Sequence, residues 1–188
     1  MRVVAGLARG IPLQLPMHDL RPTMDKVKAA IFSSLADRVP EARVLDLFAG
    51  SGALGIEALS RGASSAALVD HHAKASDAMR FNLQKTRLTA TVHREEVFHF
   101  LKRNTAVFDL IFADPPYGKS ADATDFAGQL LQSPDLARAL APEGIFILER
   151  HPAPPPAATA LFTLLRQKSY GASEVLFLSH PPSPLAAA

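Results

Sequence analysis

The chain has 188 residues, of which 48% are hydrophobic, and a formal net charge of +2, so it is long enough for one domain with a substantial core and has no strong overall charge bias. It contains no cysteine, which excludes disulfides, thiolate zinc sites and cysteine nucleophiles. No stretch is apolar enough for a signal peptide or a membrane span, so we expect a cytoplasmic protein without a membrane partner.

The first forty residues are predicted to form an appendage that consists of a β-hairpin and a helix. Residues 2–5 and 11–15 can pair around a loop that has glycines at both ends. A helix then begins after Pro22, because four apolar side chains recur at intervals of three and four positions on one face. They are Met24, Val27, Ile31 and Leu35. The basic side chains of this segment suit either a solvated surface or contacts with phosphate groups. They are Arg2, Arg9, Arg21, Lys26, Lys28 and Arg38.

From residue 43 onward, short apolar runs alternate with helical patterns, which is typical of βαβ units. Strands are predicted at residues 44–48, 66–70, 91–93, 108–114, 145–149, 161–167 and 175–179. Helices are predicted at residues 53–61, 73–86, 97–104, 124–132 and 135–140, and a turn at 142–144. We therefore expect an α/β, Rossmann-like fold in residues 41–180, with a seven-stranded, mostly parallel sheet and helices on both faces. Residues 181–188 are expected to be a disordered tail.

A glycine-rich turn follows the first strand of this core. Gly50, Gly52 and Gly55 fit the pattern G-x-G-x-x-G between a strand and a helix, where open α/β folds bind ligands. Glycines allow a tight turn and a close approach of backbone N–H groups to the ligand. Asp70 ends the second strand, twenty residues after Gly50, and can accept hydrogen bonds from both ribose hydroxyls of an adenosine. These residues predict a nucleoside cofactor, either S-adenosylmethionine or a nicotinamide dinucleotide.

Further side chains around this turn are candidates for contacts with the same cofactor. Asp46 lies inside an apolar strand, where an unpaired carboxylate is costly. We expect it to bond to the loop backbone or to contact the amino-acid portion of the cofactor. Glu96 follows the third strand and could accept a hydrogen bond from the adenine amine, with Glu95 as its rival and helix capping as the alternative role. Phe48 and Ser51 complete the predicted cofactor set.

The sequence Asp114-Pro115-Pro116-Tyr117 follows the fourth strand and should reach the same edge of the sheet. An exocyclic amine of a nucleobase is a poor nucleophile because its lone pair is delocalised into the ring. The Asp114 carboxylate and the Pro115 carbonyl can accept its hydrogens, and the two prolines hold that carbonyl in place. Tyr117 can stack on a base that has left its helix. The motif predicts methylation of a base amine by S-adenosylmethionine through orientation and electrostatics.

With these motifs, the sequence resembles the RsmD-like family of bacterial 16S rRNA guanine-N2 methyltransferases. The similarity lies in residues 2–6, 9–10, 20–28, 45–58, 114–117 and 170–171. It implies a class I methyltransferase fold, S-adenosylmethionine as donor and N2 of a guanine in 16S rRNA as acceptor. It also implies action on rRNA or on the assembling small ribosomal subunit. Separately, we expect a monomer. The hairpin and residues 21–28 would then face RNA, with contacts from Arg2, Arg9, Arg21, Thr23 and Lys26.

Three other functions fit part of the sequence. Adenine-N6 methylation of DNA would use the same tetrapeptide, but the chain has no room for a separate DNA-recognition domain. An NAD-dependent oxidoreductase fits the glycines and Asp70, but it leaves residues 114–117 without a role and needs a proton-transfer pair that we do not find. A noncatalytic RNA-binding module would explain the basic segment but neither motif. The seven histidines lack the spacing of metal ligands, so no metal is expected.

Overall fold

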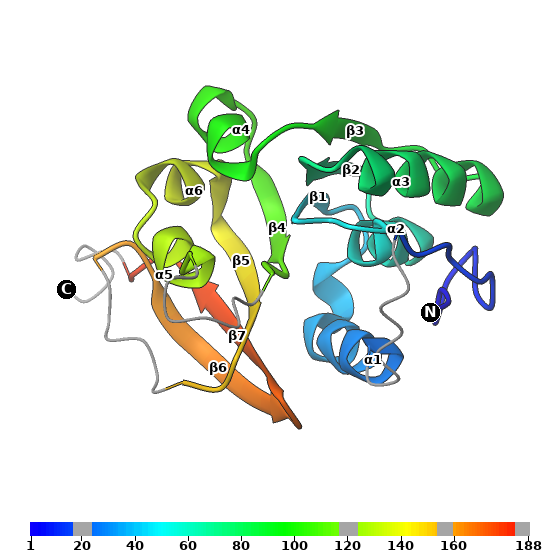
Figure 1. Cartoon of the computed structure of the whole chain (residues 1–188). Coiled ribbons are helices and arrows are strands. Elements are labelled where there is room, and N and C mark those ends of the chain that lie inside the picture. The colour runs from blue at the N-terminus through cyan, green and yellow to red at the C-terminus, as the bar shows by residue number, and fades with distance from the viewer. Residues whose placement is uncertain (17–23, 117–123, 154–159, 183–188) are drawn as a thin grey trace.

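The apolar runs of the core form one seven-stranded sheet in the computed structural model, which describes residues 1–16, 24–116, 124–153 and 160–182 (Figure 1). The strand order is β3-β2-β1-β4-β5-β7-β6. Strands β1 to β5 are parallel, and β7 pairs antiparallel with both β5 and β6. The strands are β1 (Arg43–Leu47), β2 (Ser65–Asp70), β3 (Thr91–Arg94), β4 (Phe108–Ala113), β5 (Leu140–Arg150), β6 (Thr163–Tyr170) and β7 (Ser173–Ser179). The predicted mostly parallel α/β sheet is confirmed.

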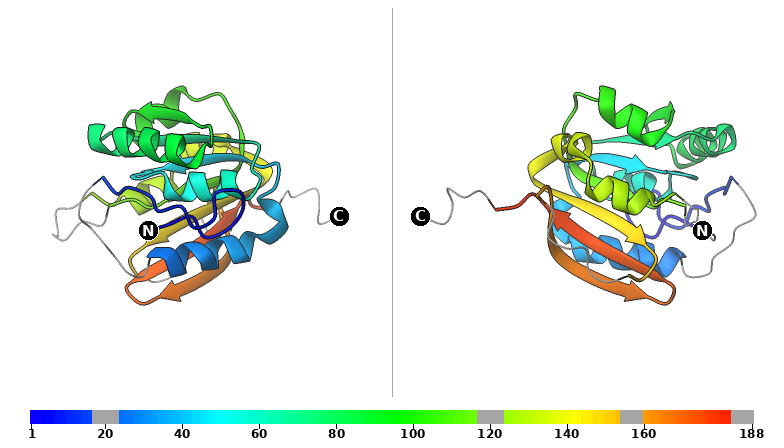
Figure 2. Two further views of the ribbon diagram at one scale, coloured as in Figure 1. Left: turned by 90° about the vertical axis from the view of Figure 1, so that its right-hand side faces the viewer. Right: turned by 60° about the vertical axis from the view of Figure 1, so that its left-hand side comes forward.

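Helices cover both faces of the sheet because its inner strands are apolar on both sides. Val44 and Leu45 are neighbours in β1 and are fully buried, yet they belong to two different hydrophobic clusters. Helices α1 to α3 pack on the first cluster and α4 to α6 on the second (Figures 1 and 2). The helices are α1 (Met24–Leu35), α2 (Ala53–Ser60), α3 (Ala73–Thr86), α4 (Val97–Arg103), α5 (Phe126–Leu131), α6 (Pro134–Ala139) and the 3₁₀ helix η1 (Ala36–Arg38). Within the described ranges, no helix combines the length and the apolar character of a membrane span.

The N-terminal hairpin forms as predicted, but it is irregular and packs on the core. The Val3 N–H donates to the Ile11 carbonyl at 3.0 Å, and the Gly10 N–H donates to the Val3 carbonyl at 2.8 Å. An isolated bridge joins Arg2 and Pro12. The side chains of Val3 and Leu13 are buried in the same cluster as α1 and α2. The hairpin is therefore anchored to the domain by apolar burial as well as by hydrogen bonds.

The turn predicted at residues 142–144 is wrong, because this segment lies inside the long strand β5. The pairing with β4 shifts there: Phe108 is opposite Leu140, whereas Leu110 is opposite Ile145. Two steps along β4 thus correspond to five steps along β5, and the extra residues form a bulge. Proline and glycine at 142 and 144 mark that bulge instead of a chain reversal.

Helix α5 and strand β6 also differ from the prediction, for local reasons. Helix α5 begins at Phe126 instead of residue 124, because the Asp125 side chain caps it by accepting the Gly128 N–H at 2.8 Å. Strand β6 runs from Thr163 to Tyr170 instead of 161–167. The polar C-terminal end of β6 stays in the strand because it pairs with β7 in a hairpin, in which Tyr170 is opposite Ser173.

Candidate active site

The glycine turn between β1 and α2 lies at the carboxyl edge of the sheet, next to the point where the strand order reverses between β1 and β4. Gly50 has a φ of +54°, and a Cβ atom there would meet nothing nearer than the Phe48 carbonyl oxygen at 4.0 Å. The space beside Gly50 is therefore open. Gly55 has the opposite role, since a Cβ atom there would lie 2.2 Å from the Leu68 side chain. The first glycine leaves room for a ligand, and the third lets α2 pack closely on the sheet.

Asp70 lies beside this turn at the end of β2. Its Oδ2 atom accepts the Gly50 N–H at 2.9 Å, and its Oδ1 atom accepts the His72 N–H at 2.9 Å. The side chain is buried, with 7% of the residue exposed. Each carboxylate oxygen has two lone pairs, so both oxygens keep acceptor capacity for hydroxyl groups of a ligand. Asp70 thus stabilises the turn and presents acceptors next to it.

Asp46 is buried under the turn and binds its backbone. Its Oδ2 atom accepts the Gly55 N–H at 2.9 Å. Burial raises the pKa of Asp46 to about 8; the Gly55 N–H opposes this shift, and the nearby carboxylates of Asp114 and Asp70 add to it. The expected bond to the loop backbone is confirmed, and a contact with a cofactor stays a prediction.

The raised pKa of Asp46 predicts a pH dependence of stability. Because the folded-state pKa of about 8 exceeds the ordinary value of 3.8, the folded protein binds this proton more tightly than the unfolded chain does. The resulting stabilisation is full below about pH 4 and is lost as the pH rises to about 8. Asp46→Asn keeps an oxygen acceptor for Gly55 but does not ionise. Urea unfolding between about pH 5 and pH 8 should show a decline in the wild type, by up to about 1.4 kcal/mol per pH unit, that is smaller in the variant. Equal slopes would contradict this assignment.

The motif after β4 reaches the same edge of the sheet. Ala113 pairs with Leu47, so Asp114 follows β4 at the level where β1 enters the glycine turn. Asp114 is half-buried, Pro115 is buried and Pro116 is exposed, whereas Tyr117 lies outside the described residues. The effect of Asp114 on the pKa of Asp46 is a further sign that the two carboxylates are close. The structure therefore brings Asp46, Asp70, Asp114 and the glycine turn together.

Phe48 begins the turn in an unusual backbone conformation. Its φ of +57° falls in the left-handed region, which bulky side chains rarely adopt and which is often found at functional sites. The Phe48 ring centroid lies 5.4 Å from that of Phe126 in α5, and the Phe126 centroid lies 6.4 Å from that of Phe98 in α4. These rings form an aromatic contact between the turn and the helices of the opposite face. Ser51, which follows Gly50, is itself buried, with 6% exposed.

The two acidic residues after β3 have structural partners. The Glu96 side chain caps α4, because its Oε2 atom accepts the His99 N–H at 2.8 Å. Glu95 forms two hydrogen bonds with the Arg103 guanidinium, at 2.7 and 2.6 Å. The Arg103 guanidinium is the largest cause of a lowered pKa at Glu95. The capping role considered for this pair thus belongs to Glu96. Its contact with an adenine amine stays a prediction.

The residues predicted to contact RNA lie in different places. Arg2 and Lys26 are exposed, and Met1 contacts Ser51 at 3.9 Å, which places the chain start near the glycine turn. Arg9 lies in the hairpin loop, and the neighbouring Leu7 N–H donates to Ser60, the last residue of α2. An eight-residue helix spans about 12 Å, so Arg9 lies at the end of α2 that is remote from the turn. Two further candidates, Arg21 and Thr23, lie outside the described residues.

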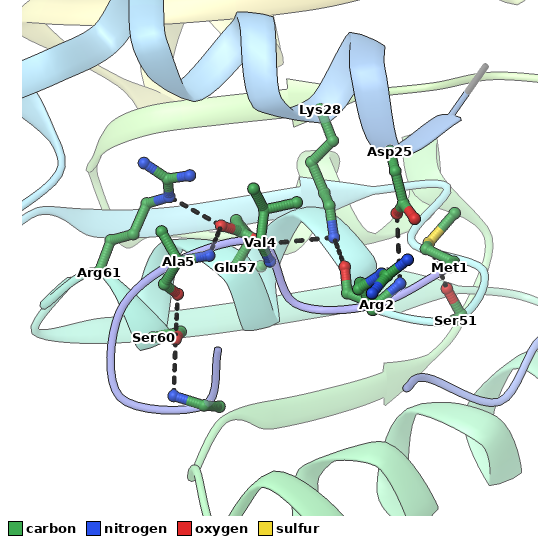
Figure 3. A network of polar contacts seen from close by, with 12 residues as sticks. Met1, Arg2, Val4, Ala5, Asp25, Lys28, Ser51, Glu57, Ser60 and Arg61 are labelled. Carbon is green, nitrogen blue, oxygen red and sulfur yellow. Dashed lines mark hydrogen bonds and ion pairs between the residues drawn. The ribbon is translucent and has the colours of Figure 1, made fainter. Parts of the chain in front are cut away.

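A buried ion pair that the sequence did not predict anchors the N-terminal segment (Figure 3). Glu57 in α2 is fully buried and accepts the N–H groups of Val4 at 2.7 Å and Ala5 at 3.0 Å. It also pairs with Lys28 at 3.2 Å and with Arg61 at 2.8 Å. Burial lowers the pKa of Lys28, and the Glu57 carboxylate opposes this shift. A glutamate inside an apolar stretch of α2 was the available signal, because such a carboxylate must be paired.

A surface cavity of about 390 Å³ lies at the other edge of the sheet. Its lining includes Ser65, Thr91 and Phe108, which are the first residues of β2, β3 and β4. Ligands of open α/β sheets bind at the carboxyl ends of the strands, so this cavity is not the candidate site. Among the described residues, no group of three His, Asp or Glu side chains could hold a metal ion.

Comparisons with known proteins find relatives and solved structures that match most of the chain. Residues 1–179 match the family described as Conserved hypothetical protein 95. The chain is 33% identical over 177 residues to the Ribosomal RNA small subunit methyltransferase D of Haemophilus influenzae, and the alignment covers 91% of this chain and 89% of the relative. It is 43% identical over 123 residues to the Putative rRNA methyltransferase YlbH of Bacillus subtilis, which covers 62% of this chain and 67% of the relative. The solved structure of the Putative methyltransferase yhhF from Escherichia coli has a TM-score of 0.81 at 31% identity and covers 96% of this chain and 97% of that one.

Proposed function

This chain belongs to the family of Conserved hypothetical protein 95, that of the RsmD-like methyltransferases, and we propose that it methylates the N2 amine of a guanine in 16S rRNA with S-adenosylmethionine. The observation that carries the proposal is the position of two motifs at one sheet edge, where Asp70 binds the glycine turn and Asp114 follows β4 beside the end of β1. When bound, S-adenosylmethionine supplies a methyl group on a positively charged sulfur. We further propose that the protein acts in the cytoplasm as a monomer, on rRNA or on the assembling small subunit.

The residues around the turn have the donors and acceptors that such a cofactor requires. Asp70 would accept the ribose hydroxyls, and the backbone at Gly50 would lie against the ligand in the open space there. Asp46 has one carboxylate oxygen on Gly55, so the other can face the amino-acid portion directly or through water. Phe48, Ser51, Gly52 and Glu96 complete the proposed cofactor contacts.

Asp114 and its prolines would orient the acceptor amine. The Asp114 carboxylate and the Pro115 carbonyl accept the two N–H hydrogens, which directs the nitrogen lone pair at the methyl carbon. As the new C–N bond forms and the bond between methyl carbon and sulfur breaks, the amine becomes more acidic. Its surplus proton can pass to the Asp114 carboxylate or to water. Tyr117 would stack on the base, and Arg2, Arg9, Arg21, Thr23 and Lys26 within residues 1–40 would contact RNA.

Asp70→Ala should weaken cofactor binding. The substitution removes the acceptors proposed for the ribose hydroxyls and releases the Gly50 N–H from its partner. Hydrogen bonds to a charged group contribute about 1.5–3 kcal/mol each, so the Kd of S-adenosylhomocysteine should rise by about 10–100-fold. Isothermal titration calorimetry measures this, with Asp77→Ala on the exposed surface of α3 as the control. An unchanged Kd for Asp70→Ala would remove Asp70 from the site.

Glu149 supports guanine over adenine as the target base. It lies one residue beyond Leu148 in β5, and Leu148 pairs with Ala113, so it stands beside Asp114 at the sheet edge. It is half-buried, and strand alternation places it on the face of Ile147, which belongs to the cluster under α1 to α3. Guanine carries an N1–H donor beside its N2 amine, whereas N1 of adenine is an acceptor. A carboxylate here would therefore favour guanine.

Glu149→Ala should reduce kcat/KM on the mapped guanine by about tenfold or more, because a hydrogen bond to a charged acceptor is lost. An RNA with 2-aminopurine at that position keeps the exocyclic amine but lacks the N1–H. On this RNA the variant and the wild type should react at similar, low rates. Equal losses on both RNAs would show that Glu149 does not read the N1–H.

The experiment that tests the proposed function is methyl transfer to small-subunit rRNA that lacks the modification. We expect transfer from S-adenosylmethionine, with the product mapped as N2-methylguanosine. A product mapped as N6-methyladenosine would support methyl transfer to an exocyclic amine but would contradict guanine as the target base. Tight binding of NAD without any methyl transfer would contradict the proposed methyltransferase reaction.

A further inference from the structure

One side chain connects the glycine turn to the N-terminal segment. Asn82 lies in α3 and has no exposed surface. Its Nδ2 group donates to the Ser51 carbonyl at 2.9 Å and to the Gln14 carbonyl at 2.9 Å. Its Oδ1 atom accepts the Gln14 N–H at 2.8 Å. Both Nδ2 hydrogens are therefore used, one on the turn and one on the N-terminal segment, and the amide has one defined orientation.

The rest of the N-terminal segment is held by α2, the helix that follows the turn (Figure 3). Glu57 accepts the N–H groups of Val4 and Ala5, and the Ser60 hydroxyl donates to the Ala5 carbonyl at 2.6 Å. Lys28 donates to the Arg2 carbonyl at 2.6 Å, which connects α1 to the same N-terminal segment. These contacts touch α2 and α1. Asn82 differs from them because it binds a backbone carbonyl of the turn, that of Ser51 between Gly50 and Gly52, whereas the Met1 sulfur contacts only the Ser51 hydroxyl, at 3.9 Å.

Because Asn82 binds both the glycine turn and the N-terminal segment, it can couple ligand binding at the turn to docking of that segment. A ligand that lay against Gly50 would restrict the turn, and this would favour the Asn82 orientation that holds Gln14. Conversely, a docked Gln14 keeps Asn82 in place on the Ser51 carbonyl. By thermodynamic linkage, if ligand binding stabilises the docked segment, docking strengthens ligand binding by the same free energy.

We propose that Asn82 is a positioning residue that couples cofactor binding to the docking of residues 1–14. The inference rests on the proposed function in one respect, that the ligand of the turn is S-adenosylmethionine. It extends that function, because the cofactor-loaded protein would present the N-terminal segment, with Arg2, in a fixed position for RNA. Cofactor and RNA would then bind with positive cooperativity.

The test compares hydrogen exchange at the backbone amides of residues 3–14 with and without saturating S-adenosylhomocysteine. In the wild type, the ligand should slow exchange at Val3, Leu13 and Gln14 by about fivefold or more, the lower end of typical coupling factors. In Asn82→Ala, the ligand should still bind, with a Kd raised by about the same factor, and should no longer slow exchange in this segment. Gln14→Pro removes the N–H that donates to the Asn82 Oδ1 atom, although it also fixes φ at this position and leaves the Gln14 carbonyl in place. It should weaken the coupling, read at the Val3 and Leu13 amides, even if Asn82→Ala does not fold.

Thr86→Val is the matched control. Thr86 lies one turn further along α3 and is buried, and its hydroxyl donates to the Asn82 and Leu83 carbonyls within the helix. This variant should lose stability but keep the effect of the ligand on residues 3–14. The inference is overturned if the ligand binds the wild type without slowing exchange there, or if the slowing persists in both Asn82→Ala and Gln14→Pro. If the wild type does not bind S-adenosylhomocysteine at all, the proposed function fails, and this inference fails with it.

Discussion

Asp114→Ala is expected to lower the rate of methyl transfer by about 10²–10³-fold, the usual effect of removing one positioned group that stabilises a transition state. In the proposed mechanism the carboxylate acts on the amine, whereas the cofactor contacts would come from Asp70, which binds the glycine turn. The Kd of S-adenosylhomocysteine should therefore stay within about threefold of the wild-type value. Single-turnover transfer to unmodified rRNA and calorimetric titration measure the two quantities.

Two further variants separate the role of Asp114 from a loss of structure. Asp114→Asn keeps an oxygen that can accept an N–H, so it should recover a large part of the activity. Asp109→Ala changes an aspartate in the same strand, at the opposite edge of the sheet, where it pairs with Arg43 on the surface at 2.9 Å. That variant should transfer methyl groups at the wild-type rate. Wild-type turnover in Asp114→Ala would contradict the mechanism.

Glu57→Ala is expected to lower the free energy of unfolding by about 3–5 kcal/mol, the typical result of removing one partner of a buried ion pair. Lys28 is 3% exposed, so its ammonium group would be left without its counter-charge in the interior. The Val4 and Ala5 N–H groups would also lose their acceptor. Chemical denaturation measures the loss.

A second substitution tests whether the uncompensated charge is the cause. Lys28→Met removes the ammonium group and keeps much of the apolar side chain, so the double variant with Glu57→Ala should recover part of the lost stability. Strictly additive effects of the two substitutions would show that the pair contributes nothing beyond its separate hydrogen bonds. Glu57→Gln, which keeps an acceptor for the hairpin, should lie between Glu57→Ala and the wild type.

The sequence predicts the parts of this protein that depend on local periodicity. Helix α3 is predicted at residues 73–86 and occupies Ala73–Thr86, because its apolar face is regular and Arg87 ends it in the left-handed conformation. The glycine turn and the motif at Asp114 could be placed at one sheet edge, because parallel strands bring their carboxyl ends together. Both motifs are contiguous in sequence, so their positions follow from the strands that precede them.

The contacts that connect distant segments could not be predicted in this way. Glu57 and Val4 are 53 residues apart, and Asn82 and Gln14 are 68 residues apart. Neither pair leaves a periodic signal, because each depends on how the hairpin packs on α2 and α3. The same holds for the bulge in β5, where Pro142 and Gly144 favour a turn locally but pairing with β4 continues the strand. It also holds for Arg9, whose distance from the turn follows from the direction in which the hairpin runs along α2.

A crystal structure of the complex with S-adenosylhomocysteine tests the central claim most directly, since that claim is a meeting of donor and acceptor sites between the ends of β1 and β4. We expect the ribose hydroxyls within hydrogen-bond distance of Asp70, the ligand against Gly50, and the sulfur atom facing Asp114 and Pro115 across a space that fits a base. A ligand bound elsewhere, or a sulfur atom separated from Asp114 by packed side chains, would contradict the account.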